Sequence, residues 1–207
     1  MTVPELLPAS PRRHTPWLRL LGRAVLAALG FRFEGNFPDL PKCVIAVAPH
    51  TSNWDFVLGM AAVFALDLKA RFIGKHSLFK GPAGALMRRV GGIPVDRRKP
   101  GDLVERTVEA FRRESQLYLA IAPEGTRFKV ERWKKGFHRI ACAAGVPIVP
   151  VAFDWRRRVI HLMPVFQPSG SWEADEPLLM ALFTREMARR PEWFWTSQAP
   201  DKAAFKP

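Results

Sequence analysis

The chain has 207 residues, the size of one domain with a full core, and its composition of 48% hydrophobic and 25% charged residues is globular. Two cysteines, Cys43 and Cys142, cannot form a disulfide framework, so we expect buried free thiols in a reducing compartment. No apolar run approaches the ~20 residues of a membrane span. The formal net charge of +13 predicts an anionic partner: phospholipid, a phosphorylated cofactor, an acidic carrier protein or nucleic acid.

The first predicted element is a basic helix over residues 17–29. Its apolar side chains recur at helical spacing and are flanked by arginines: Trp17, Leu20, Leu21, Ala24, Val25 and Leu29. One interpretation is a helix lying in a membrane interface. The other is a helix packed on the domain with its arginines in solvent. We assign residues 1–35 to this N-terminal amphipathic region and residues 36–207 to the main domain.

Short apolar runs and amphipathic segments alternate along the rest of the chain. Strands are predicted at residues 31–35, 44–48, 70–74, 93–95, 117–122, 146–153 and 159–163, and helices at 53–66, 78–90, 103–111, 132–144 and 177–188. This alternation predicts a single α/β domain with a largely parallel mixed sheet, covered by helices on both faces. Functional residues of such sheets lie at the carboxyl ends of the strands.

A histidine and an aspartate, His50 and Asp55, follow the strand at residues 44–48. Five helical residues turn through roughly 500°, so the two side chains would not share a face of one helix. They can meet if His50 lies in the turn and Asp55 points back from the first helical turn, an arrangement typical of a catalytic dyad. The alternative is purely structural, with Ser52 capping a helix and Asp55 completing a capping box.

Two more polar clusters follow strands. In the segment Pro123-Glu124-Gly125-Thr126-Arg127, the glycine permits close approach of a ligand, the threonine offers a hydroxyl and the arginine suits phosphate. Arg97, next to Asp96, either binds an anion or makes a surface ion pair. His76 and His138 lack an acidic residue at a useful spacing, so we expect ordinary structural or surface histidines. No Cys/His spacing suggests a metal site.

Four blocks together resemble the glycerolipid acyltransferases typified by 1-acylglycerol-3-phosphate acyltransferase. They are His50-x4-Asp55, Gly92–Arg97, Pro123–Arg127 and Val146–Val151, and they cover roughly residues 40 to 155. The resemblance implies transfer of a fatty acyl group from an acyl-CoA or acyl-carrier-protein thioester to a lipid hydroxyl, with no metal and no cofactor beyond the co-substrate. It implies that His50 is the general base and Asp55 orients it. Glu124, Gly125, Thr126 and Arg127 would bind the acceptor, and Arg97 would be a second phosphate contact.

The expected function is therefore acylation of a lysophospholipid such as 1-acylglycerol-3-phosphate. The expected partners are the acyl donor, this acceptor and an anionic membrane surface, with no nucleic acid, and the expected location is cytoplasmic, peripheral on the inner face of the cell membrane. One alternative is another acceptor, such as a different lysolipid or a lipid A precursor, because the segment Pro191–Trp195 faintly resembles the end of lipid A late acyltransferases. The other is a non-catalytic basic module that binds membranes or nucleic acid.

Overall fold

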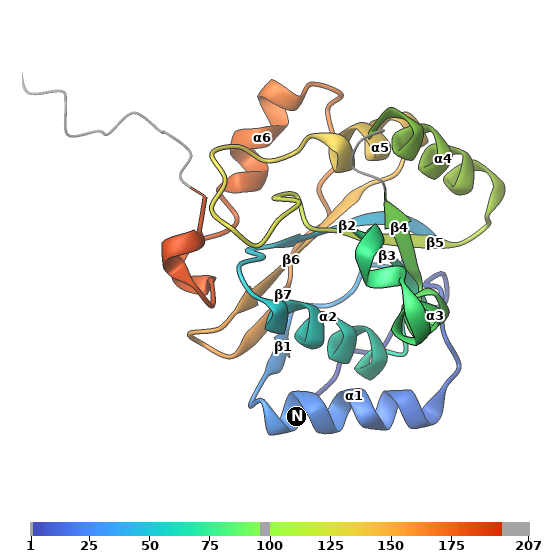
Figure 1. Ribbon diagram of the computed structural model, residues 1–207, viewed down its shortest axis with the longest axis vertical. Coiled ribbons are helices and arrows are strands. Elements are labelled where there is room, and N and C mark those ends of the chain that lie inside the picture. The colour runs from blue at the N-terminus through green and yellow to red at the C-terminus, as the bar shows by residue number, and fades with distance from the viewer. Residues whose placement is uncertain (1, 96–99, 196–207) are drawn as a thin grey trace, which may run out of the picture.

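A seven-stranded sheet forms the centre of the molecule, in the order β1-β7-β6-β2-β5-β3-β4 (Figure 1). The computed structural model describes residues 2–95 and 100–195, with only the backbone at 100–102. The strands are β1 (Arg32–Glu34), β2 (Lys42–Ala48), β3 (Ala70–Lys75), β4 (Gly92–Val95), β5 (Leu117–Ile121), β6 (Ile148–Asp154) and β7 (Val159–Leu162). Neighbouring strands are parallel except β6 and β7, which are antiparallel. The predicted mixed α/β sheet is confirmed.

Helices cover both faces of this sheet. They are α1 (Pro16–Ala28), α2 (Asn53–Ala65), α3 (Gly81–Arg89), α4 (Pro100–Arg113), α5 (Gly136–Ala144) and α6 (Trp172–Met180). Short 3-10 turns lie at His76–Phe79, Arg185–Met187 and Pro191–Trp193. Side chains of β2 alternate between two apolar clusters, as expected for a strand buried on both faces. Cys43 and Ile45 belong to the cluster under α1 and α2, whereas Val44 and Ala46 belong to the cluster under α4, α5 and α6.

Two helices differ from their predicted bounds by four residues or more at one or both ends. The helix predicted from residue 132 begins at Gly136, because the preceding residues form a loop in which Trp133 is buried and the Lys134 amide donates to the Pro123 carbonyl. The helix predicted at residues 177–188 begins five residues earlier, at Trp172, and already ends at Met180. The hydroxyl of Ser171 caps it by accepting from the Ala174 amide, and this cap overrides the usual preference of proline for the first turn.

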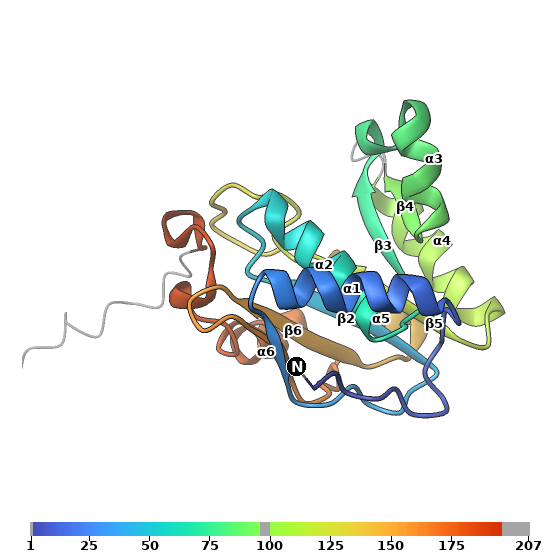
Figure 2. The ribbon, with the colours of Figure 1, turned by 90° about the horizontal axis from the view of Figure 1, so that it is seen from below.

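Helix α1 lies along α2 (Figure 2). Gly22 and Leu26 are its buried residues, whereas Trp17, Leu20 and Leu21 are exposed by 67%, 70% and 48%. Of the two interpretations of this helix, packing on the domain is confirmed. The exposed apolar side chains also suit a membrane interface, and that interpretation stays a prediction. Strand β1 pairs with β7 in the common sheet, and the domain division at residue 35 stays a prediction.

Both cysteines are free, but they differ in burial. Cys43 is buried in β2, as expected, whereas Cys142 on α5 is only half-buried, so the expectation of a buried thiol is wrong there. In the part of the chain that the structure describes, no helix combines the length and apolarity needed to cross a bilayer.

Candidate active site

His50 and Asp55 meet at the carboxyl end of β2. His50 lies in the turn after the strand, and Asp55 lies in the first turn of α2, with its Oδ2 atom 3.5 Å from His50 Nδ1. The same Oδ2 atom accepts a hydrogen bond of 2.7 Å from the Ser52 amide, so the capping box is also present. The two interpretations of this motif are therefore compatible, because the cap fixes the carboxylate in the direction of the histidine.

The other oxygen of Asp55 has a partner that the sequence analysis did not identify. The indole Nε1–H of Trp155 donates to Asp55 Oδ1 at 2.7 Å. Trp155 follows β6, which is the parallel neighbour of β2, and this register brings the two strand ends together. A tryptophan just after a predicted strand was visible in the sequence, but no local spacing relates it to Asp55.

Burial shifts the proton affinities of the pair in opposite directions. Burial and, secondarily, the positive charge of Arg127 lower the pKa of His50 to about 4. Burial raises the pKa of Asp55 to about 6, opposed by hydrogen bonds from Ser52, Trp155 and the Thr51 amide and by the charge of Arg189. At neutral pH the imidazole is therefore uncharged and the carboxylate ionised, which are the states that a general base and its orienting partner require.

Glu124 has a different environment from the one expected of a ligand-binding side chain. It is 3% exposed, and its Oε1 and Oε2 atoms accept hydrogen bonds of 3.0 and 2.8 Å from the His50 amide. Burial, together with the nearby charge of Asp55, raises its pKa to about 8, although the hydrogen bond from His50 opposes this shift. The loop after β5 is thereby tied to the backbone of His50, and the expected contact of Glu124 with substrate stays a prediction.

The remaining residues of the expected acceptor loop come directly after Glu124 in the chain. Gly125 has a φ of +63°, a conformation that glycine adopts without strain. The Thr126 hydroxyl accepts a long hydrogen bond of 3.4 Å from the Phe128 amide. Arg127 is half-buried, and its Nε atom has no hydrogen-bond partner among the described residues. Arg97 and its neighbour Asp96 lie outside the described residues, so the second phosphate contact stays a prediction.

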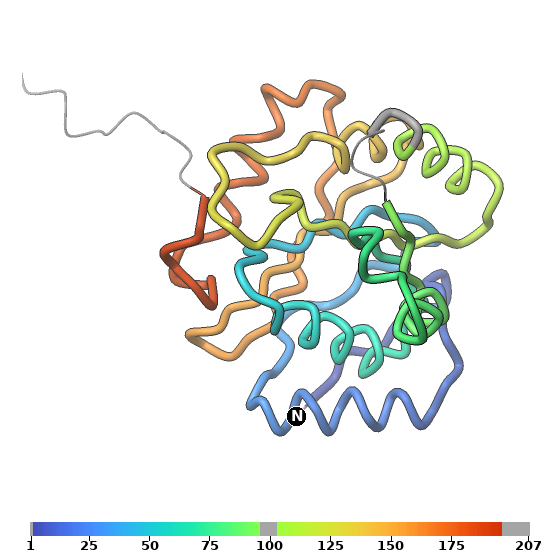
Figure 3. Tube along the Cα trace, in the orientation of Figure 1, coloured from blue at the N-terminus to red at the C-terminus, as the bar shows by residue number. Residues whose placement is uncertain are grey.

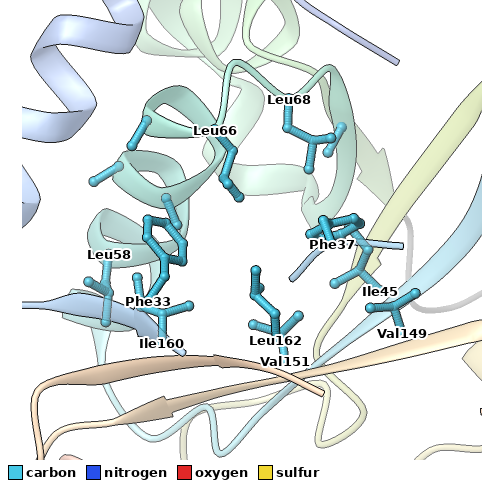
Figure 4. Close-up of a cluster of buried hydrophobic side chains, with 14 of the residues drawn as sticks. Phe33, Phe37, Ile45, Leu58, Leu66, Leu68, Val149, Val151, Ile160 and Leu162 are labelled. Carbon is cyan, nitrogen blue, oxygen red and sulfur yellow. The ribbon is translucent and has the colours of Figure 1, made fainter. Parts of the chain in front are cut away.

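An apolar cavity of about 150 Å³ extends from His50 and Asp55 between α2 and the sheet. Its walls include side chains from several strands and from the segment between β1 and β2: Phe33, Phe37, Ile45, Val151, Ile160 and Leu162. Figure 4 shows these side chains around an open space beside α2. An apolar cavity of this size stays dry and can hold a small hydrocarbon, so the space suits an alkyl group and not a polar ligand.

His138 is a buried structural histidine, and the reason given for that expectation was wrong. Its Nε2 atom lies 2.7 Å from Asp175 Oδ2, so an acidic partner exists 37 residues away in the chain. The pair joins α5 to α6 on the opposite face of the sheet from α2. His76 is exposed, as expected. Within the described residues, no group of three or more His, Cys, Asp or Glu side chains could hold a metal ion.

Comparison with known proteins identifies the family of this chain. The sequence model of the Acyltransferase family matches residues 31–154, which include β1 to β6, His50, Asp55 and the loop from Glu124 to Arg127. The chain belongs to the acyltransferase family. Its sequence resemblance to glycerolipid acyltransferases is thereby confirmed at the level of the family.

Several relatives of this acyltransferase carry the name 1-acyl-sn-glycerol-3-phosphate acyltransferase. The Brassica napus chloroplastic protein BAT2 is 32% identical over 109 residues, which are 49% of this chain and 31% of the relative. The Limnanthes douglasii protein is 29% identical over 136 residues, which are 60% of this chain and 47% of the relative. The Escherichia coli protein is 29% identical over 166 residues, 75% of this chain and 65% of the relative. The chain therefore spans about a third to two thirds of these relatives' lengths.

A solved structure shares the fold. The crystal structure of the 1-acyl-sn-glycerophosphate acyltransferase PlsC from Thermotoga maritima matches with a TM-score of 0.62 and 21% identity, over 83% of this chain and 77% of that one. At this identity the likeness supports the fold alone. It agrees with the mixed sheet and the helical layers described above.

Proposed function

We propose that this protein transfers a fatty acyl group from an acyl thioester to the free hydroxyl of 1-acylglycerol-3-phosphate or a close lysophospholipid. The observation that carries the proposal is that His50 Nδ1 lies 3.5 Å from Asp55 Oδ2 and that both residues line an apolar cavity. The lowered pKa of His50, caused by burial and by the charge of Arg127, favours the uncharged imidazole that a base requires. Family membership and the names of the relatives support the same reaction.

In the proposed reaction, His50 acts as general base. With Nδ1–H directed at Asp55, Nε2 accepts the proton of the acceptor hydroxyl as its oxygen attacks the thioester carbonyl. The new C–O bond forms, the C–S bond breaks, and the proton passes from His50 to the departing thiolate. A positioned base of this kind typically contributes about 10²–10⁴-fold to the rate. Backbone N–H groups of the turns are the proposed donors to the oxyanion.

Substrate binding divides between polar and apolar surroundings. Arg127 is proposed to bind the acceptor phosphate, with Arg97 as the second contact, because a guanidinium matches phosphate geometry. The apolar cavity is proposed to take the end of an acyl chain. The basic surface is proposed to bring the protein to an anionic membrane, as a peripheral protein on the inner face of the cell membrane.

The reaction is tested by release of free thiol from a long-chain acyl-CoA when 1-acylglycerol-3-phosphate is added. We expect acceptor-dependent release by the wild type, a loss of at least 100-fold in His50→Ala, estimated from the usual contribution of a general base, and wild-type rates in the exposed control His76→Ala. An acyl-carrier-protein thioester is run in parallel to identify the donor. If His50→Ala folds and keeps more than a few per cent of the rate, the proposed base is wrong.

The phosphate contact has its own test. A panel of acceptors with and without the phosphate is compared in the wild type and in Arg127→Met. The phosphate-bearing acceptor should be preferred by the wild type, and the preference should fall in the variant because the guanidinium fork is lost. Equal rates on both acceptors in the wild type would contradict a phosphate site at Arg127 and favour another lipid acceptor.

A further inference from the structure

The carboxylate of Asp55 has a partner that lies 100 residues away in the sequence. Trp155, just after β6, donates its indole N–H to Asp55 Oδ1 at 2.7 Å. The second oxygen, Oδ2, accepts from Ser52 and faces His50. Rotation of the carboxylate plane would break the bond to Trp155, so the indole holds the carboxylate in the orientation in which one oxygen faces the histidine.

The indole of Trp155 is itself held on several sides. The Arg189 guanidinium lies 4.6 Å from the ring centroid of Trp155 and 5.0 Å from that of Trp54, so it is stacked between two indoles. Phe31 packs edge-on against Trp155, with centroids 5.0 Å apart, and Arg158 lies over the same indole at 5.5 Å. Such cation–π contacts are attractive and orient the ring.

Arg189 belongs to a C-terminal segment, residues 185–195, that returns to the start of α2 (Figure 3). The Arg190 amide donates to the Thr51 hydroxyl at 3.1 Å, and the Trp155 amide donates to the Met187 carbonyl at 3.0 Å. Residues 185–195 are therefore tied both to the loop that carries His50 and to the end of β6. These bonds hold the Arg189 guanidinium over the indole of Trp155, where its charge lowers the pKa of Asp55.

We propose that Trp155 and Arg189 are positioning residues of the acyl-transfer site, which act on His50 through Asp55. The expected effect on the reaction rate rests on the proposed function. The expected effect on the protonation of Asp55 rests on the geometry alone. Trp155 supplies a hydrogen bond to the ionised carboxylate, and Arg189 supplies a positive charge and fixes the indole. Loss of either the hydrogen bond or the positive charge favours the protonated form of Asp55, which no longer orients the imidazole of His50.

Other charged and hydrogen-bonding groups around Asp55 also influence its protonation. His50 and the Thr51 and Ser52 amides face it from its own loop, Glu124 faces it from the loop after β5, and Arg127 acts on His50. None of these is altered by substitutions at Trp155 or Arg189. A change in the acidic limb of the activity profile is therefore assigned to the coupled pair of His50 and Asp55, of which Asp55 is the member that contacts Trp155.

The kinetic test compares Trp155→Phe with the wild type across pH. Phenylalanine keeps an aromatic ring but removes the N–H donor. We expect kcat to fall about tenfold and the acidic limb to move about one unit to higher pH, since a hydrogen bond to a charged group is lost. The KM for the acyl donor should change little. Arg189→Met should move the limb in the same direction, by an amount that decreases with added salt. The control Trp172→Phe, on α6, should keep the wild-type profile.

A second measurement is independent of turnover. The indole N–H resonance of Trp155, assigned by its disappearance in Trp155→Phe, should shift with pH around a midpoint of about 6 and should lose this transition in Asp55→Asn. Absence of that transition in the wild type overturns the inference, as does a wild-type pH profile in a folded Trp155→Phe. If the transition is present but neither donor nor acceptor is turned over, the positioning contact stands and the proposed reaction fails.

Discussion

Asp55 shows how one side chain joins local structure to chemistry. Its Oδ2 atom caps α2 through Ser52 and faces His50, while Oδ1 accepts from Trp155. The first two contacts were predictable, because the residues involved lie within five positions of Asp55. The contact with Trp155 was not predictable, since it depends on the register between β2 and β6. Likewise, the bond between Glu124 and the His50 amide follows only from the adjacency of β2 and β5.

Glu124 allows a stability prediction at this scale. Its folded pKa, about 8, is raised above the ordinary value of 4.5, so its contribution to stability is present below that value and is lost as the pH rises through about 8. Glu124→Gln removes this titration. We therefore expect the wild type to lose stability relative to the variant between about pH 5 and pH 9, as measured by urea unfolding at each pH.

The matched control for this titration is Glu105→Gln, on the exposed side of α4. Its difference from the wild type should stay constant over the same pH interval. A constant difference for Glu124→Gln as well would show that the buried carboxyl does not change its protonation on unfolding.

At the scale of elements, the contact between α1 and α2 depends on one glycine. A Cβ atom built on Gly22 would lie 2.5 Å from the Ala65 amide nitrogen and 2.6 Å from the Ala61 carbonyl oxygen. Both neighbours are backbone atoms of α2, so they cannot move aside as a flexible side chain would. Gly22 therefore permits the two helices to approach at backbone distance.

Gly22→Ala should consequently destabilise the protein by about 1–3 kcal/mol, the usual cost of an overpacked contact. This sign is opposite to the helix preference of alanine over glycine, which alone would stabilise α1 by about 1 kcal/mol. Urea unfolding measures the change, and Ala24→Leu on the exposed face of α1 is the control, with an expected change within about 0.5 kcal/mol. A more stable Gly22→Ala protein would refute the close packing of these helices.

Sequence periodicity predicted the order of strands and helices well, since β2 and β6 are apolar runs of the kind that a sheet covered on both faces buries. All seven residues of β6 and five of the seven in β2 are buried. It predicted helix ends less well. The Ser171 cap decides where α6 begins, although Pro177 favoured a later start. The hydrogen bond of the Lys134 amide to Pro123 belongs to a loop and delays the start of α5. The cavity could not be predicted either, because its walls come from segments between Phe33 and Leu162.

At the scale of the whole molecule, positive charge and exposed apolar side chains occur together. The net charge is +13, and three large apolar side chains of α1 are exposed: Trp17, Leu20 and Leu21. A surface with both properties suits an anionic bilayer, where the charge attracts the protein and the apolar groups enter the interface.

Replacing Trp17, Leu20 and Leu21 by serine should weaken binding to anionic phospholipid vesicles at least tenfold, since each buried large apolar side chain contributes about 1.5–3 kcal/mol. Vesicle sedimentation measures the binding, and the rate on a soluble short-chain substrate should be unchanged. Leu178→Ser is the matched control, because Leu178 is 61% exposed but lies on α6, which covers the other face of the sheet. Unchanged binding of the triple variant would remove α1 from the membrane contact.

The return of residues 185–195 to the loop of His50 also has a consequence for biosynthesis. The hydrogen bond between Arg190 and Thr51 joins positions 139 residues apart, so the ribosome makes the histidine and aspartate long before it makes the arginine that holds their supporting indole. The emerging chain can form most of the sheet while Trp155 still lacks Arg189. The full support of the indole should thus form as a late event of folding, and a chain clipped before residue 185 should lack the guanidinium that packs on Trp155.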